Sequence, residues 1–255
     1  MKQKLLTDVE LRARWSQERS DCYCVEENVI LTPAASDFIR EHGITLCRKE
    51  RKNAETMTRT AIPMRDGKPV YQDAQTGRET MSKGEGMTHL RGNLLVPKTH
   101  PQIAFRGQLD TLMAMIMQVQ ILAQEQGQKQ IVSDLDELLE FSHKILAAEV
   151  KDEPLAEVTM LGMNSEEIRY NSQQVKKVFG IDHPIPSYRM GKLCVELNRL
   201  RTQIRETELC AAQAFYCGGS FSRPDIIEAL NRMSSCVYIL MCRKLSGYYD
   251  RGNRL

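Results

Sequence analysis

The chain has 255 residues, of which 42% are hydrophobic, 27% charged and 6% aromatic. Its 35 basic and 33 acidic side chains give a formal net charge of +2, which lacks the excess of basic charge typical of nucleic-acid-binding modules. The 15 glycines, 9 prolines and 8 cysteines exclude the collagen-like, disordered and disulfide-scaffold classes. A chain of this length and apolar content can form one or two domains with a hydrophobic core.

The hydrophobic segments are short. The longest apolar run near the C-terminus, CVYILMC, has seven residues, whereas about 20 are needed to span a bilayer. The N-terminal stretch reaches charged residues before an apolar core forms, unlike a secretory signal. Five of the eight cysteines fall in helical sequence, where a free thiol behaves as a small hydrophobe. We therefore expect a reduced, cytoplasmic protein.

A first segment, residues 1–50, predicts a small α/β unit of strand, helix and strand. Val29–Leu31 is strand-like, and Thr32 before a proline is typical of a helix N-cap followed by the first helical position. Gly43 can end that helix in a left-handed conformation. Residues 44–47 can then return as a second strand.

A second segment, residues 51–100, is polar and punctuated by Gly and Pro. A loop of this length is usually mobile or functional. The stretch DGKPV predicts a short hairpin, and we expect the rest to be a linker that orders on binding a ligand or partner. Lys83, Thr88 and Lys98 surround a glycine-rich stretch before a helix, where backbone and cations can hold phosphates. A glycine-rich surface loop has the same composition.

From residue 101 to 255 the hydrophobic pattern is helical. We expect a first helix from about residue 101. Four more are expected at about 131–150, from Asn164 to Gly180, at about 189–216 and at about 224–246. Glu167, three residues after Asn164, indicates a capping box. The first helix carries an apolar stripe in steps of four and three residues, formed by Phe105, Leu109, Leu112, Ile116, Val119 and Ala123. The fold predicted is therefore mainly α: a five-helix bundle with a small N-terminal α/β segment.

Charged residues lie beside the apolar stripe of the helix at 189–216. Arg201, Arg205 and Glu208 are spaced four and three residues apart, so they share one helix face. The two guanidinium groups match the oxygens of a multiply charged anion such as a phosphate. A ladder of intrahelical salt bridges on a solvated face accounts for the same spacing, and from the spacing alone it is the preferred interpretation.

Polar residues also line one side of the otherwise apolar helix at 224–246: Asn231, Ser234, Ser235 and Tyr238. Buried polar groups are hydrogen-bonded, so this stripe faces either the charges of the preceding helix or a ligand. Asp110, in the first helix of the bundle, is a candidate partner for one of the arginines.

The general motifs of enzymes and metal sites are largely missing. There is no GxxxxGK[ST] phosphate loop, no dinucleotide-type glycine triplet and no HExxH. Cys22 and Cys24 are one residue apart, which is not the usual spacing of zinc ligands, and no further His/Cys set accompanies them. We expect ordinary thiols and no bound metal.

Several segments together resemble the ATP:cob(I)alamin adenosyltransferases, most closely the ethanolamine-utilisation branch. They are MTHL at 87–90, FRGQLDTL at 105–112, LNRLRTQIRETE at 197–208 followed by AAQAF, and RPDIIEALNRMSSCVYILM at 223–241. The likeness covers residues 83–246. It implies transfer of the 5′-deoxyadenosyl group of ATP, bound with Mg²⁺, to cob(I)alamin. The products are adenosylcobalamin and triphosphate, and the expected recipient is an ethanolamine ammonia-lyase.

The resemblance also implies roles for individual residues. Arg205 and Glu208 would contact the ATP phosphates and their Mg²⁺ surroundings, and Asn231 would help to hold the nucleotide. Asp110 and Arg201 would form a salt bridge that shapes the nucleotide and corrinoid site, near a subunit boundary. Relatives hold the corrinoid in an apolar pocket.

The remaining roles rest on weaker matches. Lys83, Thr88 and Lys98 would belong to a loop that closes on the triphosphate, although only SKGEGMT remains of the family's longer phosphate loop. Ser235 stands where the wider family has Asp. Some relatives carry a cysteine-rich metal motif before the bundle. Residues 50–88 contain no cysteine, so no transition metal is carried over.

The resemblance finally implies partners and a location. We expect a homo-oligomer, a trimer or dimer, with ATP near the subunit interfaces. Ethanolamine ammonia-lyase or microcompartment proteins are the expected partners, in a cytoplasmic location associated with a bacterial microcompartment, without nucleic acid or membrane contacts. The alternative is a non-catalytic helical scaffold or corrinoid carrier that kept the bundle.

Overall fold

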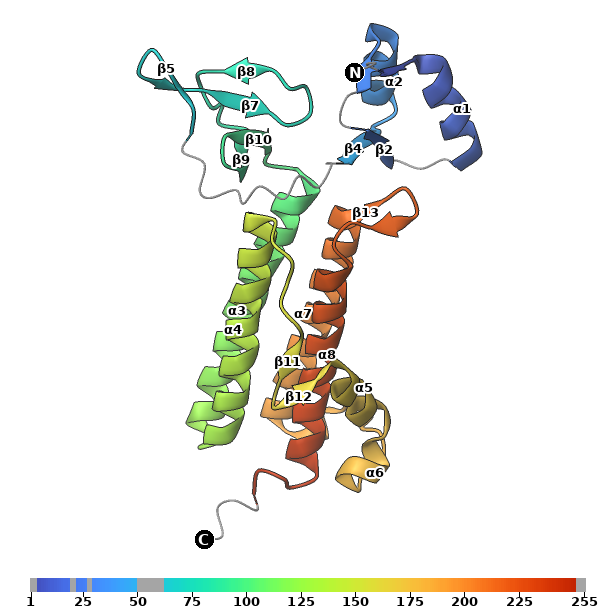
Figure 1. Ribbon diagram of the computed structural model, residues 1–255. Coiled ribbons are helices and arrows are strands. Elements are labelled where there is room, and N and C mark those ends of the chain that lie inside the picture. The colour runs from blue at the N-terminus through green and yellow to red at the C-terminus, as the bar shows by residue number, and fades with distance from the viewer. Residues whose placement is uncertain (1–3, 19–21, 27–28, 50–61, 251–255) are drawn as a thin grey trace. The chain divides into compact units, whose positions relative to one another are not determined.

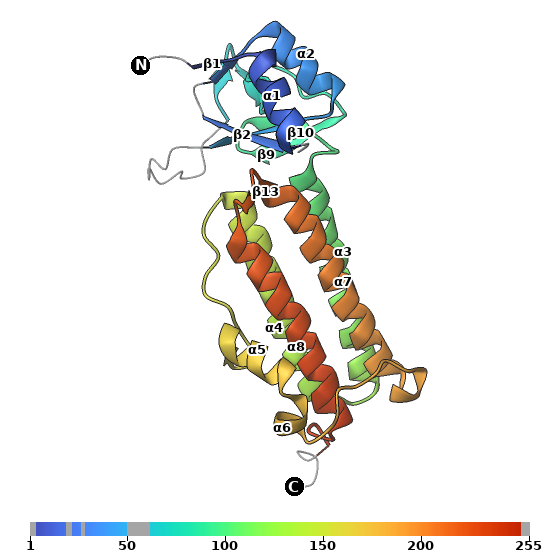
Figure 2. The ribbon, with the colours of Figure 1, turned by 90° about the vertical axis from the view of Figure 1, so that its right-hand side faces the viewer.

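The computed structural model describes residues 4–18, 22–26, 29–49 and 62–250. The chain divides into two compact units. One unit contains residues 1–84, 92–96 and 215–222, and the other contains residues 85–91, 97–214 and 223–255. The described structure is mainly helical, as predicted (Figures 1 and 2). Within it, no helix has the length and apolarity needed to cross a membrane.

The N-terminal part of the first unit contains the predicted strand, helix and strand. These elements are β3 (Val29–Leu31), α2 (Pro33–Glu41) and β4 (Thr45–Lys49). The Thr32 side chain accepts a hydrogen bond from the amide of Ala35, which caps α2. Gly43 takes the left-handed conformation, at φ 63°. The local chemistry predicted from the sequence is therefore confirmed here.

Three further elements of this part were not predicted: β1 (Lys4–Leu6), α1 (Asp8–Glu18) and β2 (Cys22–Glu26). β1 pairs with β3, and β2 pairs with β4, both in parallel. Helix α1 buries Leu11 and packs Trp15 against Phe38 and His42. Helix α1 has too few apolar residues to form a recognisable helical stripe in the sequence. Hydrophobic periodicity therefore did not predict it.

Residues 62–97 form short strands, where a linker was expected to order only on binding. The predicted hairpin is present as β5 (Met64–Arg65) and β6 (Lys68–Pro69), and its turn residues Asp66 and Gly67 both have positive φ. A four-stranded sheet follows, in the order β8-β7-β10-β9. Its strands are β7 (Tyr71–Asp73), β8 (Glu79–Thr80), β9 (Met87–Arg91) and β10 (Leu94–Pro97). Residues 50–61 of the expected linker lie outside the described ranges.

A few buried side chains and turn glycines stabilise these strands, although the segment is polar in composition. Val70, Leu95 and Val96 are buried, so a few apolar side chains anchor the segment. Gly77 and Gly92 adopt positive φ in the turns between strands, where glycine avoids the steric cost of a side chain. Strands of two to five residues are too short to show an alternating pattern in the sequence.

The second unit contains the helical bundle. Its long helices are α3 (Pro101–Glu125), α4 (Lys129–Lys151), α7 (Lys192–Phe215) and α8 (Pro224–Leu245). All six residues of the stripe predicted on α3 are buried. A short hairpin of β11 (Thr159–Met160) and β12 (Met163–Asn164) precedes α5. Another hairpin, β13 (Tyr216–Cys217) and β14 (Ser220–Phe221), joins α7 to α8 and belongs to the first unit.

The single helix expected between Asn164 and Gly180 is two helices, α5 (Ser165–Gln173) and α6 (Val175–Phe179). The capping box is present. The Glu167 amide donates to Asn164 Oδ1 and the Asn164 amide donates to Glu167 Oε2, both at 2.9 Å. Gln174 leaves the helical conformation, at ψ 45°. Each helix buries its own apolar side chain, Ile168 or Val175.

A buried ion pair joins α3 to α4. Arg106 donates from Nε and Nη2 to the two carboxylate oxygens of Glu149, at 2.6 and 3.3 Å. It also donates to the backbone carbonyls of His89 and Leu90 in β9. The Glu149 side chain is 1% exposed and that of Arg106 18%. The pair therefore ties two helices and a strand together through one guanidinium group.

We predict that Arg106→Met destabilises the protein by about 3–5 kcal/mol, because it leaves the Glu149 carboxylate buried without its partner. The double variant Arg106→Met/Glu149→Met removes both charges and should recover part of this loss. Urea unfolding at neutral pH measures both effects. Lys144→Gln is the control, because the Lys144–Glu140 pair is exposed and its loss should leave the midpoint unchanged. A midpoint equally unchanged in Arg106→Met would contradict the assignment.

Candidate functional site

The charged face predicted on α7 does not form an intrahelical ladder. Arg205 is exposed and makes no hydrogen bond or ion pair with any of the described residues. Arg201 donates from Nε to Asn198 Oδ1, at 3.1 Å, rather than to an acid. The i,i+3 ion pair found on this helix, Arg199 with Glu196, lies on another face. The preferred interpretation from spacing, a salt-bridge ladder, is therefore wrong, and the Arg205 guanidinium is free to meet an anion.

The polar stripe of α8 meets this face of α7. Asn231 donates from Nδ2 to Glu208 Oε1, at 3.2 Å. Ser234 and Ser235 donate their hydroxyl hydrogens to the backbone oxygen of Asn231, so their polar groups are satisfied within the helix. Of the stripe's residues, Asn231 therefore provides the polar contact to Glu208 on α7.

Tyr238 lies farther along the same stripe and makes a second polar contact. Its hydroxyl is 2.9 Å from Nδ1 of His183, and the two rings are nearly parallel, with centroids 6.2 Å apart. Burial, with Cys242 next in effect, raises the pKa of Tyr238 to about 12, against the opposing influence of Arg201. Tyr238 is therefore a neutral phenol at physiological pH. It lies within electrostatic range of Arg201.

The predicted salt bridge between Asp110 and Arg201 is not formed within one chain. Asp110 is exposed and has no ion-pair partner among the described residues. It shares a helix face with Ala114, Met117 and Ile121, which follow at steps of four, three and four residues. Met117 and Ile121 are 47% and 61% exposed. Asp110 thus lies at one end of an exposed apolar stripe on α3.

The residues of the predicted phosphate loop are distributed over both units. Thr88 lies half-buried in β9, and Lys98 makes an exposed ion pair with Glu85, at 3.1 Å. Both belong to the unit that contains α7, whereas Lys83 is exposed and belongs to the other unit. Their role in closing on a triphosphate stays a prediction.

One polar residue of the site escaped the sequence analysis. Arg232, next to Asn231, donates from Nη1 to Asn231 Oδ1, at 2.9 Å. It also donates from Nε to the Ser165 hydroxyl at the start of α5, at 2.8 Å. Its position within the matched segment RPDIIEALNRMSSCVYILM was the available signal, but the polar stripe taken from helix spacing did not include it.

The free thiols of the bundle are in environments that disfavour reactivity. Burial raises the pKa of each, which disfavours the reactive thiolate. In the described part of the chain, no group of three or more His, Cys, Asp or Glu side chains could hold a metal ion. The thiols concerned are Cys194, Cys210, Cys236 and Cys242.

The remaining cysteines belong to the first unit. Cys217 is disulfide-bonded, which differs from the expectation of reduced thiols. Cys22 and Cys24 lie in β2, but their side chains fall outside the described part of the structure. Whether this pair is free of metal therefore stays a prediction.

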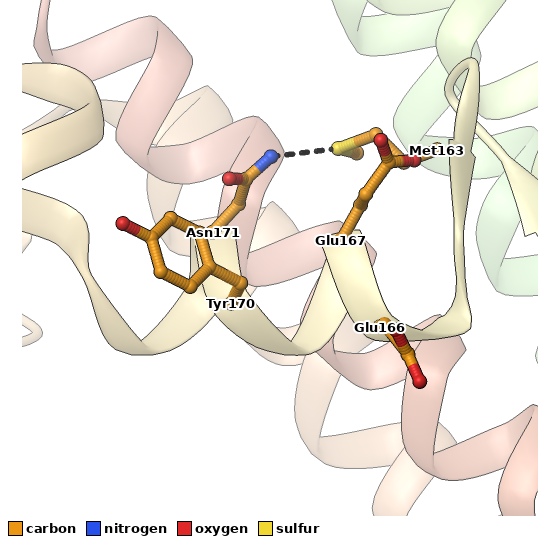
Figure 3. Close-up of a pocket in the computed structure, with 5 residues that line it drawn as sticks. All are labelled: Met163, Glu166, Glu167, Tyr170 and Asn171. Atoms are coloured by element: carbon orange, nitrogen blue, oxygen red, sulfur yellow. Dashed lines mark hydrogen bonds between the residues drawn. The ribbon is translucent and has the colours of Figure 1, made fainter.

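A surface pocket at α5 is separate from the residues described above (Figure 3). Two of its residues already serve local structure. Glu167 belongs to the capping box of α5, and Asn171 contacts the sulfur of Met163 from Nδ2, at 3.0 Å. The lining residues are Met163, Glu166, Glu167, Tyr170 and Asn171. With two carboxylates and no basic side chain, this lining does not suit a triphosphate.

Comparison with known proteins relates these helices to a family. The family model described as cobalamin adenosyltransferase matches residues 79–244. The corrinoid adenosyltransferase EutT of Salmonella typhimurium is 37% identical over 163 residues, which are 63% of this chain and 59% of that protein. The protein of the same name from Escherichia coli K12 is 36% identical over 161 residues, 62% and 58% of the two chains.

The matched region therefore spans about three-fifths of these relatives' length. No solved structure matches the chain. The family match covers well over half of the chain and includes α3, α7 and α8, which carry Asp110, Arg205 and Asn231. The chain belongs to the cobalamin adenosyltransferase family.

Proposed function

We propose that this chain transfers the 5′-deoxyadenosyl group of ATP to cob(I)alamin, giving adenosylcobalamin and triphosphate for an ethanolamine ammonia-lyase. The observation that carries this proposal is the Arg205 guanidinium, exposed and without a partner among the described residues. It lies on the helix face of Glu208, which Asn231 contacts from α8. Family membership and the EutT relatives support the same reaction.

The reaction is a nucleophilic displacement at the 5′-carbon of ATP. The cobalt of cob(I)alamin supplies the electron pair of the new Co–C bond, and the C5′–O bond breaks. Its electron pair leaves with the triphosphate. No proton needs to be removed, so the protein has to align the reactants and stabilise the leaving charge.

The residues of the α7–α8 face suit these tasks. Arg205 offers a guanidinium fork for phosphate oxygens. Glu208 accepts a hydrogen bond from Asn231 at Oε1, and its carboxylate would hold the Mg²⁺ that accompanies the nucleotide, since carboxylate oxygens suit this hard cation. Lys83, Thr88 and Lys98 are proposed to close on the triphosphate.

The corrinoid needs an apolar contact beside this polar face. The segment before α7 carries two exposed apolar side chains, Ile185 and Tyr188. His183, in the same segment, is bonded to Tyr238 on α8. The segment is thereby attached to α8 at a residue within electrostatic range of Arg201, which supports the proposal that it meets the apolar face of the corrinoid.

We predict that Arg205→Ala lowers the rate of adenosylcobalamin formation about a hundredfold, because losing one charged donor to a developing anion costs on the order of 3 kcal/mol. Single-turnover absorbance changes of the corrinoid measure the rate. Arg199→Ala is the matched control on the same helix, since Arg199 pairs with Glu196 on another face, and it should retain the wild-type rate. Equal rates for wild type and Arg205→Ala would instead favour the scaffold or carrier.

The exposed stripe on α3 supports a homo-oligomer. Asp110 has no ion-pair partner among the described residues, and Met117 and Ile121 on the same helix face are exposed apolar side chains. We infer that a second copy of this chain covers the stripe. In that assembly, Asp110 pairs with the neighbouring copy's Arg201.

Ile121→Lys should therefore shift the mass measured by light scattering towards the monomer and lower activity, because it places a charge in the interface. Val178→Lys, also at an exposed apolar position but on α6, should leave both unchanged. A wild-type protein that is monomeric at all concentrations would refute the inferred interface.

The N-terminal α/β segment is proposed to dock to the lyase or to a microcompartment. A chain lacking residues 1–50 is expected to keep its adenosyltransferase activity, because the face of α7 and α8 lies outside that segment. The same variant should lose its co-localisation with ethanolamine ammonia-lyase in cells. Co-localisation that survives the truncation would exclude this role.

A further inference from the structure

We propose that Arg232 is a positioning residue that fixes the orientation of the Asn231 amide in the nucleotide site. This inference rests on the proposed function, because it assigns a role to a residue beside the proposed nucleotide contact. It adds Arg232, Ser165 and Glu228 to the residues on which the site depends.

Two charged side chains on opposite sides determine which way the Asn231 amide faces. Glu208 can only accept hydrogen bonds when ionised, so it selects the amide nitrogen, which donates to it at 3.2 Å. Arg232 can only donate, so it selects the amide oxygen, at 2.9 Å. In a flipped amide, the Asn231 nitrogen would face the Arg232 donor and the Asn231 oxygen would face the Glu208 acceptor, so neither hydrogen bond could form. The two contacts therefore reinforce a single orientation.

Arg232 is itself held in place by α5. Its Nε donates to the Ser165 hydroxyl at 2.8 Å, and Ser165 donates in turn to Glu228 Oε1 at 2.6 Å. The Arg232 side chain is 15% exposed and lies 3.5 Å from Glu228. Because Nε and Nη1 serve Ser165 and Asn231 at the same time, the planar guanidinium has little freedom to rotate. The single nitrogen of a lysine lacks this fork.

The fixed amide keeps capacity for a ligand. Asn231 Nδ2 carries two hydrogens, and one is used by Glu208. Its oxygen has two lone pairs, and one is used by Arg232. A nucleotide can therefore meet one N–H and one lone pair in a predetermined arrangement. Without Arg232, the amide keeps the Glu208 bond alone and must be ordered when the nucleotide binds.

A double-mutant cycle with separate KM measurements for ATP and cob(I)alamin tests this role. We expect Arg232→Met to raise the KM for ATP roughly tenfold, the value of about one hydrogen bond, and to leave the KM for cob(I)alamin unchanged. Arg232→Lys should behave like Arg232→Met, and Ser165→Ala should raise the KM for ATP less. In an Asn231→Ala background, Arg232→Met should cause no further rise.

Arg243→Met is the matched control. Arg243 is on the same helix, is also 15% exposed and pairs with the buried Asp134, so its loss costs stability without touching Asn231. It should lower the unfolding midpoint and leave the KM for ATP unchanged. Additive effects of Arg232→Met and Asn231→Ala would overturn the proposal. So would a normal KM for ATP in Arg232→Met. A wild-type protein that neither binds MgATP nor forms product would overturn the proposed function, and this inference with it.

Discussion

The hydrogen bond from Asn231 to Glu208 is the contact on which the proposed site depends. It joins α7 to α8 at a point where both helices carry polar residues beside an apolar seam. Farther along, Arg201 lies within electrostatic range of Tyr238. Since α7 residue numbers fall as those of α8 rise between these two contacts, the helices run antiparallel. One register therefore sets the relative positions of every α7 and α8 residue assigned to the site.

Among the described residues on this face of α7 and α8, some polar side chains are hydrogen-bonded to one another and one is not. Arg201, Asn231 and Glu208 all have hydrogen-bond partners, whereas Arg205 on the same face has none in the described part of the chain. Because Arg205 is exposed, water solvates its guanidinium in the free protein, and the group stays available to an anion that binds this face. The ion pair of Arg106 and Glu149 shows the opposite case, because there both charges are consumed in joining α3 to α4.

Sequence periodicity predicted the long helices because each buries a continuous stripe. Local chemistry predicted the cap at Thr32, the capping box at Asn164 and the hairpin turn at Asp66 and Gly67. The strands at 71–97 and helix α1 were missed because each depends on very few buried side chains. The break at Gln174 was missed because it follows from the separate packing of Ile168 and Val175, which are contacts that spacing does not encode.

For the candidate site, too, residue spacing predicted some features and not others. Spacing placed Arg201, Arg205 and Glu208 on one face and identified the polar stripe of α8. It could not show that Arg205 has no acidic partner among the residues that the structure describes, or that Arg201 donates to Asn198. Nor could it show that Arg232 reaches Ser165, which precedes it by 67 residues. The Asp110–Arg201 pair came from family resemblance. A single chain does not form it, so that pair depends on the inferred assembly.

The central claim is the reaction itself. The most direct test is to mix the purified, metal-stripped protein with chemically reduced cob(I)alamin and MgATP while following the absorbance of the corrinoid. The account predicts light-sensitive adenosylcobalamin, formed in equal amount with triphosphate. Binding of ATP and corrinoid without any product, even after divalent transition metals are added back, would contradict it and leave a corrinoid carrier.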